Sequence, residues 1–264
     1  AAGKYSLTNN TRGENNVAIG RLAMESNTTG FNNIAIGSEA LNSNTEGSNN
    51  IALGQNALRV NTTGIQNIAL GNGSLDSNTT GLNNIAQGLN VLTSNTTGSN
   101  KIALGVAGQA LNTTGYDNIS FGPLALFANS VGVGNIAIGS TTLFNSSGSK
   151  NIGFGIFAGD SLTSGDNNII IGANSIDFAS TTGSNQLNIG NLIWGTGLDG
   201  TGTTVSTGNI GIGTTSPAQK LSVVGGFQLT GQFRDSTYAS GTLGMLLQST
   251  GTSTIWVATS SLGI

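Results

Sequence analysis

Carboxylates are the side chains best suited to chemistry in this 264-residue chain, because it has eleven acids but no His and no Cys. Two acids roughly 5 to 9.5 Å apart can hydrolyse a glycosidic bond, and Asp160 and Asp166 are the best pair available. The acids nevertheless fall at variable positions of a repeat, where solvated residues belong. We therefore interpret them as surface charge and predict that the chain is not an enzyme. They are Glu14, Glu25, Glu39, Glu46, Asp76, Asp117, Asp160, Asp166, Asp177, Asp199 and Asp235.

Cofactor and metal sites are also not expected. Without His and Cys, the chain lacks the commonest general base, a thiolate nucleophile and the usual zinc and haem ligands. Residues 208–213 lack the third glycine and the following helix of a dinucleotide-binding loop. The turns lack the periodic Asp of calcium-binding repeats. We predict no catalytic, cofactor-binding or metal-binding residues and no cofactor.

Charge and hydropathy narrow the range of partners. Eight basic residues and a net charge of −3 give no basic surface, so binding along a phosphate backbone is not expected. No apolar run approaches the roughly 20 residues that a membrane-spanning helix needs. We therefore expect neither nucleic acid as a partner nor a membrane span.

A 17-residue repeat organises most of the chain. The pattern Asn-Ile-Ala-Ile/Leu-Gly recurs, and each closing glycine lies 17 residues after the one before it; Gly155, Gly172 and Gly190 extend the series with looser spacing. A fixed period of this kind is typical of solenoid proteins. The strictly spaced glycines are Gly20, Gly37, Gly54, Gly71, Gly88, Gly105, Gly122 and Gly139.

Each repeat predicts a short strand. Ile34 and Ile36 alternate with Ala35, which is the period of two expected of a strand. The Asn-Thr-Thr-Gly segment and the closing glycine predict turns, and Ala40 and Leu41 predict a second short strand. One repeat cannot fold alone, because its few aliphatic side chains do not offset the ordering of its backbone. Stacking of successive coils is therefore required.

Stacking predicts an all-β chain: a β-solenoid or β-roll of about eleven 17-residue coils over residues 1–190, followed by a β-rich C-terminal segment over residues 191–264. Ile and Leu columns are expected to form the core, and Asn side chains to form amide ladders along the stack. The Ala column that includes Ala35 has two open interpretations. It is either a flat face on which neighbouring chains pack closely, or the tight interior of the roll.

The threonines and the phenylalanines suggest two possible binding surfaces. Threonine columns from Thr28 and Thr29 could form an ice-binding array, although Glu46 interrupts the second column and adjacent threonines point to opposite faces. Six phenylalanines crowd into the later coils, where filling of the core is favoured over a sugar-binding platform. They are Phe121, Phe127, Phe144, Phe154, Phe157 and Phe178.

The residues also resemble known fibre proteins. Asn-Asn-Ile-Ala-Ile-Gly, followed by a polar pair, Ala and a glycine turn, is similar to the head repeat of trimeric autotransporter adhesins, with about three extra residues per turn. The longer unit resembles repeats of bacterial and phage tail-fibre-like proteins over residues 1–190. Residues 209–217, Asn-Ile-Gly-Ile-Gly-Thr-Thr-Ser-Pro, look like the stretch that precedes the intramolecular chaperone of endosialidase-type tail fibres.

The resemblance implies a left-handed parallel roll in which three chains pack side by side. The expected function is that of a structural or adhesive segment of an extracellular homotrimeric fibre, located at a cell surface or on a virion. Expected partners are further copies of the chain and a cell-surface glycan or protein receptor. An ice- or carbohydrate-binding solenoid and a subunit of a head-to-tail filament remain open as alternatives.

Overall fold

The computed structural model describes residues 1–174, 177–228, 230, 232–243, 245–250 and 252–262. Within these residues the chain is all-β, apart from one short 3-10 helix, Thr259–Leu262. It divides into two compact units, residues 1–224 and 225–264. The strands of the first unit are β1 Val17–Ile19, β2 Ile34–Ile36, β3 Ile51–Leu53, β4 Ile68–Leu70, β5 Ile85–Gln87, β6 Ile102–Leu104, β7 Ile119–Phe121, β8 Ile136–Ile138, β9 Ile152–Phe154, β10 Ile169–Ile171, β11 Leu187–Ile189, β12 Ile193–Gly195, β13 Ile210–Ile212 and β14 Leu221–Val223.

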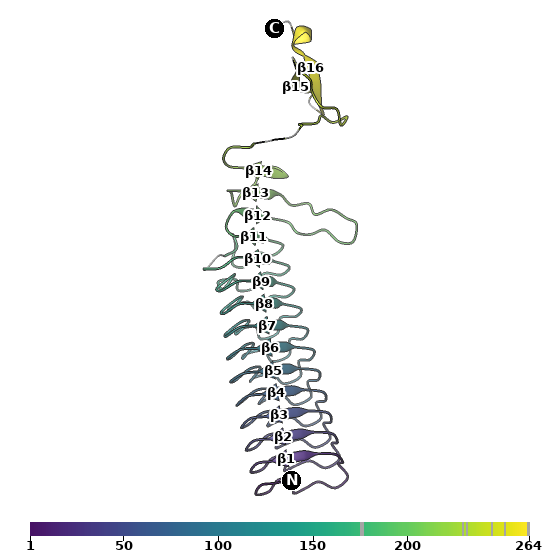
Figure 1. Ribbon diagram of the computed structural model, residues 1–264, viewed down its shortest axis with the longest axis vertical. Coiled ribbons are helices and arrows are strands. Elements are labelled where there is room, and N and C mark those ends of the chain that lie inside the picture. The colour runs from purple at the N-terminus through teal and green to yellow at the C-terminus, as the bar shows by residue number, and fades with distance from the viewer. Residues whose placement is uncertain (175–176, 229, 231, 244, 251, 263–264) are drawn as a thin grey trace. The chain divides into compact units, whose positions relative to one another are not determined.

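Strands β1 to β11 form a parallel stack, with one strand per coil (Figure 1). Equivalent residues pair without slippage, so Ile34 lies opposite Ile51 and Ala35 opposite Ala52. This is a β-solenoid with the predicted 17-residue period. The turns are also hydrogen-bonded from coil to coil, as when the N–H of Leu41 donates to the carbonyl of Ala57 at 3.0 Å. Each coil therefore satisfies its backbone on the next coil.

The stack changes direction after β11. Strand β12 pairs antiparallel with both β11 and β13, and β13 then pairs parallel with β14. The loop between β12 and β13 projects from the stack (Figure 1). In the second unit, β15 (Met245–Ser249) and β16 (Thr254–Ala258) form an antiparallel hairpin. The run around Trp256 is therefore a strand.

The interior of each coil is narrow. Its hydrophobic residues in the regular coils are the central alanine of the strand and the Ala-Leu pair of the following turn, as in Ala35, Ala40 and Leu41, all with no exposed surface. Gly153 replaces the central alanine of β9, and a Cβ there would lie 2.9 Å from the Leu143 side chain. At this coil the space opposite the turn leucine therefore admits only a small side chain, whereas the equivalent position of β10 holds the buried Ile170.

Two expectations about the core were wrong. The Ile columns do not face inward: in every strand from β1 to β10 the central residue is the buried one, and its two neighbours are partly or fully exposed. The Ala column is instead the tight interior, which was the second of the two interpretations. Ala40 and Leu41 also form a turn rather than a second strand. The reason is the left-handed backbone of Glu39 (φ 61°) and Leu41 (φ 50°), which lies outside the β region of a regular strand.

Glycine is required where the coils come closest. The backbone of Gly54 has a φ of 138°, and a Cβ on it would lie 2.5 Å from the carbonyl oxygen of Gly71. The same contact recurs along the column of closing glycines, from Gly3 with Gly20 to Gly155 with Gly172. Glycine therefore recurs at this position because any side chain here would separate two coils.

Two ladders of buried asparagine line the interior, as predicted. In the turn ladder, Nδ2 of Asn44 donates to Oδ1 of Asn27 at 2.8 Å, and Asn61 repeats this contact on Asn44. In the strand ladder, Oδ1 of Asn33 accepts the main-chain N–H of Asn50 at 2.9 Å. Buried amides are stable only when their polar atoms are paired. In the regular coils the ladders meet this condition, because each side chain bonds to its equivalent one coil away.

Candidate functional site

The most extensive candidate site is a surface, which we call the apolar stripe. It consists of the outward first and third residues of strands β1–β11. The first column is aliphatic throughout, from Val17 to Leu187, and the third column is apolar with a single exception. Its members are Val17, Ile34, Ile51, Ile68, Ile85, Ile102, Ile119, Ile136, Ile152, Ile169 and Leu187 in the first column, and Ile19, Ile36, Leu53, Leu70, Gln87, Leu104, Phe121, Ile138, Phe154, Ile171 and Ile189 in the third.

The size of the apolar stripe exceeds what a solvated surface usually carries. Stacked strands are about 4.8 Å apart, so eleven levels extend over about 50 Å, with the two columns about 7 Å apart. Many of the third-column side chains remain 36% to 45% exposed, Ile138 and Ile19 being the two extremes. Contiguous apolar patches on monomeric proteins seldom exceed a few hundred Å². A continuous strip of this length is typical of a protein interface.

The one polar residue of the apolar stripe is Gln87, the third residue of β5. It is exposed and lies between Leu70 and Leu104 on the neighbouring strands. Ile85, on the same strand, keeps the first column aliphatic. No charged residue occupies either column. The stripe therefore has a single polar mark, one level away from its centre at β6.

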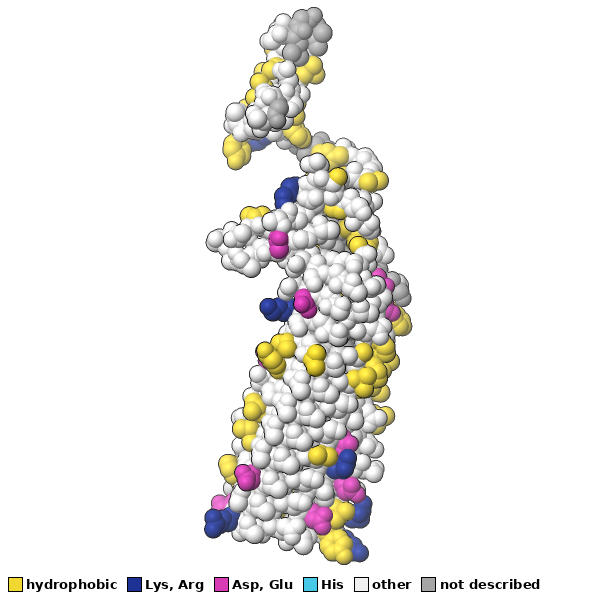
Figure 2. Space-filling model, turned by 180° about the vertical axis from the view of Figure 1, so that it is seen from behind, with side chains coloured by type: hydrophobic (Ala, Val, Ile, Leu, Met, Phe, Trp, Pro, Cys, Tyr) yellow, Lys and Arg dark blue, Asp and Glu magenta, His cyan; other side chains and the backbone are white. Residues whose placement is uncertain are grey.

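Flanking columns widen the apolar surface at some levels. Leu89, Val106 and Ile156 follow the closing glycines and are 48% to 50% exposed. Figure 2 shows hydrophobic side chains gathered along the edges of the stack, while charged side chains are few. The arrangement is suited to burial against another surface along the length of the solenoid.

The interior is interrupted by polar residues between two hydrophobic clusters. The first cluster includes the buried residues from Ala18 to Ala103, and the second begins at Ala125. Between them Gln109 stands where other coils have the turn leucine, and Ser120 stands where they have the strand alanine. Nε2 of Gln109 donates to Oγ of Ser120 at 3.0 Å, while its Oε1 has no partner among the described residues. We call the segment that contains Gln109 and Ser120, together with the neighbouring Lys101, the polar coil.

Lys101 is part of the polar coil and replaces an asparagine of the strand ladder. Its side chain is fully buried, and Nζ donates to Oδ1 of Asn95 and, at 2.7 Å, to Oδ1 of Asn112. Burial lowers the pKa of Lys101 to about 7. The direction follows from the loss of hydration, because only neutral amide oxygens accept from the ammonium group. Sequence reasoning missed this residue, although the repeat register places it at an asparagine position.

Lys101 reverses the direction of the turn ladder. From Asn27 to Asn95 each Nδ2 donates toward the previous coil. The ammonium group of Lys101 donates hydrogen bonds to the Oδ1 atoms of both Asn95 and Asn112. The Nδ2 group of Asn112 therefore donates toward the next coil instead, to Oδ1 of Asn129. Nδ2 of Asn129 is then buried without a partner among the described residues. The direction of the turn ladder thus changes between Asn95 and Asn112, where Lys101 lies between them.

The threonine columns do not form one array. Oγ1 of Thr45 donates to the carbonyl of Thr62, and Thr62 repeats this contact on Thr79, at 3.2 and 3.1 Å. These hydroxyls join neighbouring coils and are half-buried. The adjacent column, which includes Thr63 and Thr80, is exposed, and Glu46 interrupts it. Only a single column of free threonine hydroxyls is therefore presented to solvent.

The carboxylates that could have served a hydrolase have structural contacts. Asp166 accepts the main-chain N–H of Ser149 at 2.7 Å, between two coils. Asp160 is partly buried, and burial, with the nearby Asp177 carboxylate, raises its pKa. Among the described residues, no group of three or more acids is placed to hold a metal ion.

Core filling describes only one of the six crowded phenylalanines. Phe178 is buried in the second cluster. Phe127 and Phe144 stack on each other with ring centroids 5.1 Å apart, and both are half-buried. The expectation was wrong for Phe121 and Phe154, because each follows a buried strand residue and therefore points outward into the apolar stripe. Phe157, in the turn after β9, is also exposed.

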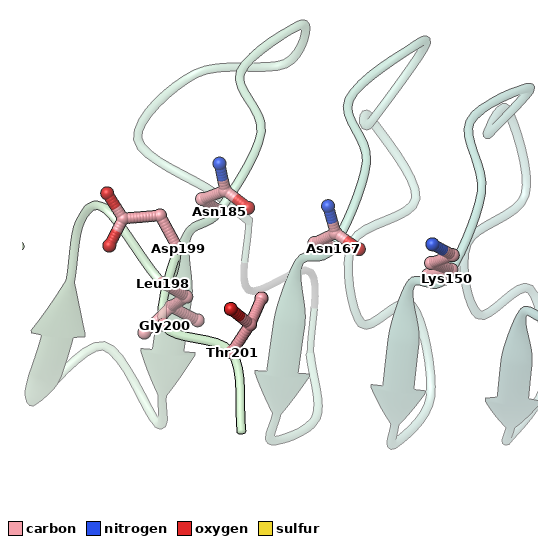
Figure 3. Close-up of a pocket in the computed structure, with 7 residues that line it drawn as sticks. All are labelled: Lys150, Asn167, Asn185, Leu198, Asp199, Gly200 and Thr201. Atoms are coloured by element: carbon pink, nitrogen blue, oxygen red, sulfur yellow. The ribbon is translucent and has the colours of Figure 1, made fainter. Parts of the chain in front are cut away.

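A small polar cavity of about 350 Å³ lies beside the loop between β12 and β13 (Figure 3). Lys150, Asn167 and Asn185 line it from three successive coils, and residues 198–201 of the loop close its other side. The Asp199 carboxylate accepts the N–H and Oγ1–H of Thr207, and these hydrogen bonds lower its pKa. The cavity therefore offers side-chain amides and one cation to a polar ligand, while the Asp199 carboxylate is held by Thr207 within its own loop.

Comparison with protein-family models, with curated proteins and with solved structures found no match. Within the described part of the chain, no helix has the length and apolarity that crossing a bilayer would require.

Proposed function

We propose that the chain is a structural segment of an extracellular fibre, in which copies of the solenoid pack side by side, most simply as a homotrimer. The observation that carries this proposal is the apolar stripe. About 50 Å by 7 Å of columns, with the width of the side chains added, approaches the roughly 800 Å² per partner of a standard interface. Association would remove this surface from water, which is the dominant driving force for assembly.

The resemblance of the repeat to adhesin heads and tail-fibre-like proteins supports the same proposal. A long stack of repeated coils is suited to multivalent display along its length, by which weak contacts combine into strong attachment. The fibre would belong at a cell surface or on a virion, with a glycan or protein as its receptor. The chain would act as a spacer or adhesive head and not as an enzyme.

The test compares substitutions inside and outside the apolar stripe. We expect the wild-type chain to sediment as a trimer in analytical ultracentrifugation. The variant Ile51→Thr/Ile85→Thr/Ile136→Thr keeps β-branched residues in the strands, so we expect it to remain folded by circular dichroism but to dissociate. The control Ile65→Thr/Leu82→Thr changes residues of similar exposure (37% each) outside the stripe and should stay assembled. A folded wild-type monomer at micromolar concentration would refute the proposal.

A carbohydrate-binding solenoid is the second candidate, and the cavity beside Asn167 and Asn185 favours it. Side-chain amides are suited to hydrogen-bonding sugar hydroxyls. Glycan-array binding that is lost in Asn167→Ala but retained in Asn83→Ala, an equivalent residue away from the cavity, would support this candidate. Ice binding is weakened by the half-buried, hydrogen-bonded threonine column, and thermal hysteresis would test it directly.

A further inference from the structure

The apolar stripe contains one polar side chain, and its position is informative. Gln87 lies at the fifth of eleven levels, and the described residues provide no hydrogen bond to its side-chain amide. Its neighbours along the column are Leu70 and Leu104. If the stripe is buried against a second copy of this chain, as the proposed function requires, the amide of Gln87 must find a partner on that copy.

The possible alignments of two copies differ in whether the Gln87 amide finds a hydrogen-bond partner. In a parallel, unshifted assembly around a rotation axis, equivalent levels meet, so Gln87 of each copy meets Gln87 of the next. Two side-chain amides can then pair, because each has both a donor and an acceptor. A shift by one coil would instead bury Gln87 against leucine, leaving an unpaired amide at a cost on the order of tenfold in association for each one.

The off-centre position also disfavours an antiparallel pair. With eleven levels, antiparallel packing that uses the whole apolar stripe places β5 opposite β7, so Gln87 meets Phe121. Matching Gln87 with itself in an antiparallel pair leaves β10 and β11 without a partner. Only the parallel, unshifted arrangement pairs the amides and keeps all eleven levels in contact.

We propose that Gln87 determines the register and the parallel orientation of self-association through the apolar stripe. A single polar residue in an apolar interface has this role in coiled coils, where it specifies register at some cost in stability. The inference deepens the proposed function and rests on it. Gln87 is a positioning residue here: it selects one arrangement among several that the aliphatic columns alone would permit.

The chain contains no Cys, so single cysteines can report the register without background. Ile34→Cys chains would cross-link to one another in the parallel, unshifted arrangement. Mixtures of Ile34→Cys with Ile51→Cys would detect a shift of one coil, and mixtures with Ile169→Cys would detect antiparallel packing. In the wild-type background we expect same-level disulfides to exceed each mixed species by about a hundredfold, because a shifted or antiparallel pair leaves one unpaired amide on each of its two chains, at about tenfold each.

Gln87→Leu removes the polar residue of the apolar stripe. The assembly should remain intact and become harder to dissociate by heat. Its mixed-level disulfides should rise to levels similar to the same-level ones. Gln55→Leu, at an exposed position outside the apolar stripe, is the matched control and should behave as wild type. Transposing the mark, as Gln87→Leu/Leu104→Gln, puts it at the central β6 level. Antiparallel disulfides should then appear, while disulfides between chains shifted by one coil remain rare.

The outcomes separate the two proposals. A wild-type monomer would overturn the proposed function. An assembled wild type whose disulfide pattern is unchanged by Gln87→Leu, or is mixed from the start, would overturn the role of Gln87 while leaving self-association intact.

Discussion

The regular coils around β2–β5 and the polar coil after β6 have the same backbone but different interiors. In the regular coils Ala35 and Leu41 are fully buried. In the polar coil the equivalent positions carry Ser120 and Gln109, with Lys101 beside them. The strands still pair in register through this segment, so the stack tolerates a polar interior wherever hydrogen bonds replace hydrophobic contacts.

The outer surface remains apolar at the levels where the interior is polar. Ile102, Leu104, Ile119 and Phe121 remain apolar on the strands that border the polar coil, and the one polar residue of the apolar stripe occurs at β5, where the interior is regular. The polarity of the outer columns therefore does not follow the polarity of the core. This difference indicates that the interior holds the coil together, while the stripe has a separate requirement, for which self-association is our proposal.

The largest expected effect tests whether the two regions share one backbone. Gly54→Ala in a regular coil and Gly105→Ala at the polar coil would each place a Cβ about 2.5 Å from the next closing glycine. We expect both to lower the free energy of unfolding by more than about 4 kcal/mol, or to prevent folding, as measured by urea denaturation. Gly190→Ala, at a φ of 58° with no atom within 4 Å, should cost only about 1 kcal/mol. A much smaller loss at Gly105 than at Gly54 would show that the polar coil is loosely stacked.

The next effect is a pH dependence confined to the polar coil. The pKa of Lys101 is about 7 in the folded chain and about 10.4 when unfolded, so the unfolded state binds one more proton between these values. The free energy of unfolding should therefore rise with pH, by up to about 1.4 kcal/mol per unit. Below pH 7 the penalty is constant, because both states are then protonated. The Lys101→Asn variant restores the ladder residue and should lose this slope between pH 7.5 and 9.5 in urea titrations; an identical slope in both proteins would contradict the assignment.

The sequence was sufficient for the architecture because its determinants repeat. Gly54 and Asn44 recur at a fixed spacing, and each interacts with its own equivalent one coil away, so the period, the strand before each closing glycine and the ladders could be predicted. Which face of each strand points into the core could not be predicted. The alternation of Ile34, Ala35 and Ile36 is the same whichever side is inside, and the outcome depends on how much space the turn leucine leaves.

The polar coil was less predictable, for a different reason. Lys101 and Gln109 depart from the repeat, and the register alone marks them as exceptions. Their hydrogen bonds depend on residues of neighbouring coils, such as Asn95 and Ser120, whose mutual positions are fixed only by the stacked structure. The same reasoning applies to Gln87, which becomes significant only when its columns are known to face outward.

A reciprocal exchange of interiors should have an intermediate effect. Gln109→Leu/Ser120→Ala gives the polar coil the regular residues and removes a buried unpaired oxygen, so we expect a gain of about 1 to 3 kcal/mol in the free energy of unfolding. Leu92→Gln/Ala103→Ser moves the polar pair one coil back, into the first hydrophobic cluster, and should lose a similar amount. Denaturation followed by circular dichroism measures both. Loss of stability in both variants would mean that each interior is adapted to its own coil.

The smallest effect concerns the polarity of the turn ladder. Nδ2 of Asn61 donates to Asn44 and to the carbonyl of Gly64, whereas Nδ2 of Asn129 has no partner among the described residues. Asn61→Ala therefore removes more hydrogen bonds than Asn129→Ala, and we expect it to cost about 1 kcal/mol more. In the Lys101→Asn background the ladder can regain one direction, which would give Asn129 a partner. The cost of Asn129→Ala should then rise toward that of Asn61→Ala, and an unchanged difference would indicate that Lys101 does not set the polarity of the ladder.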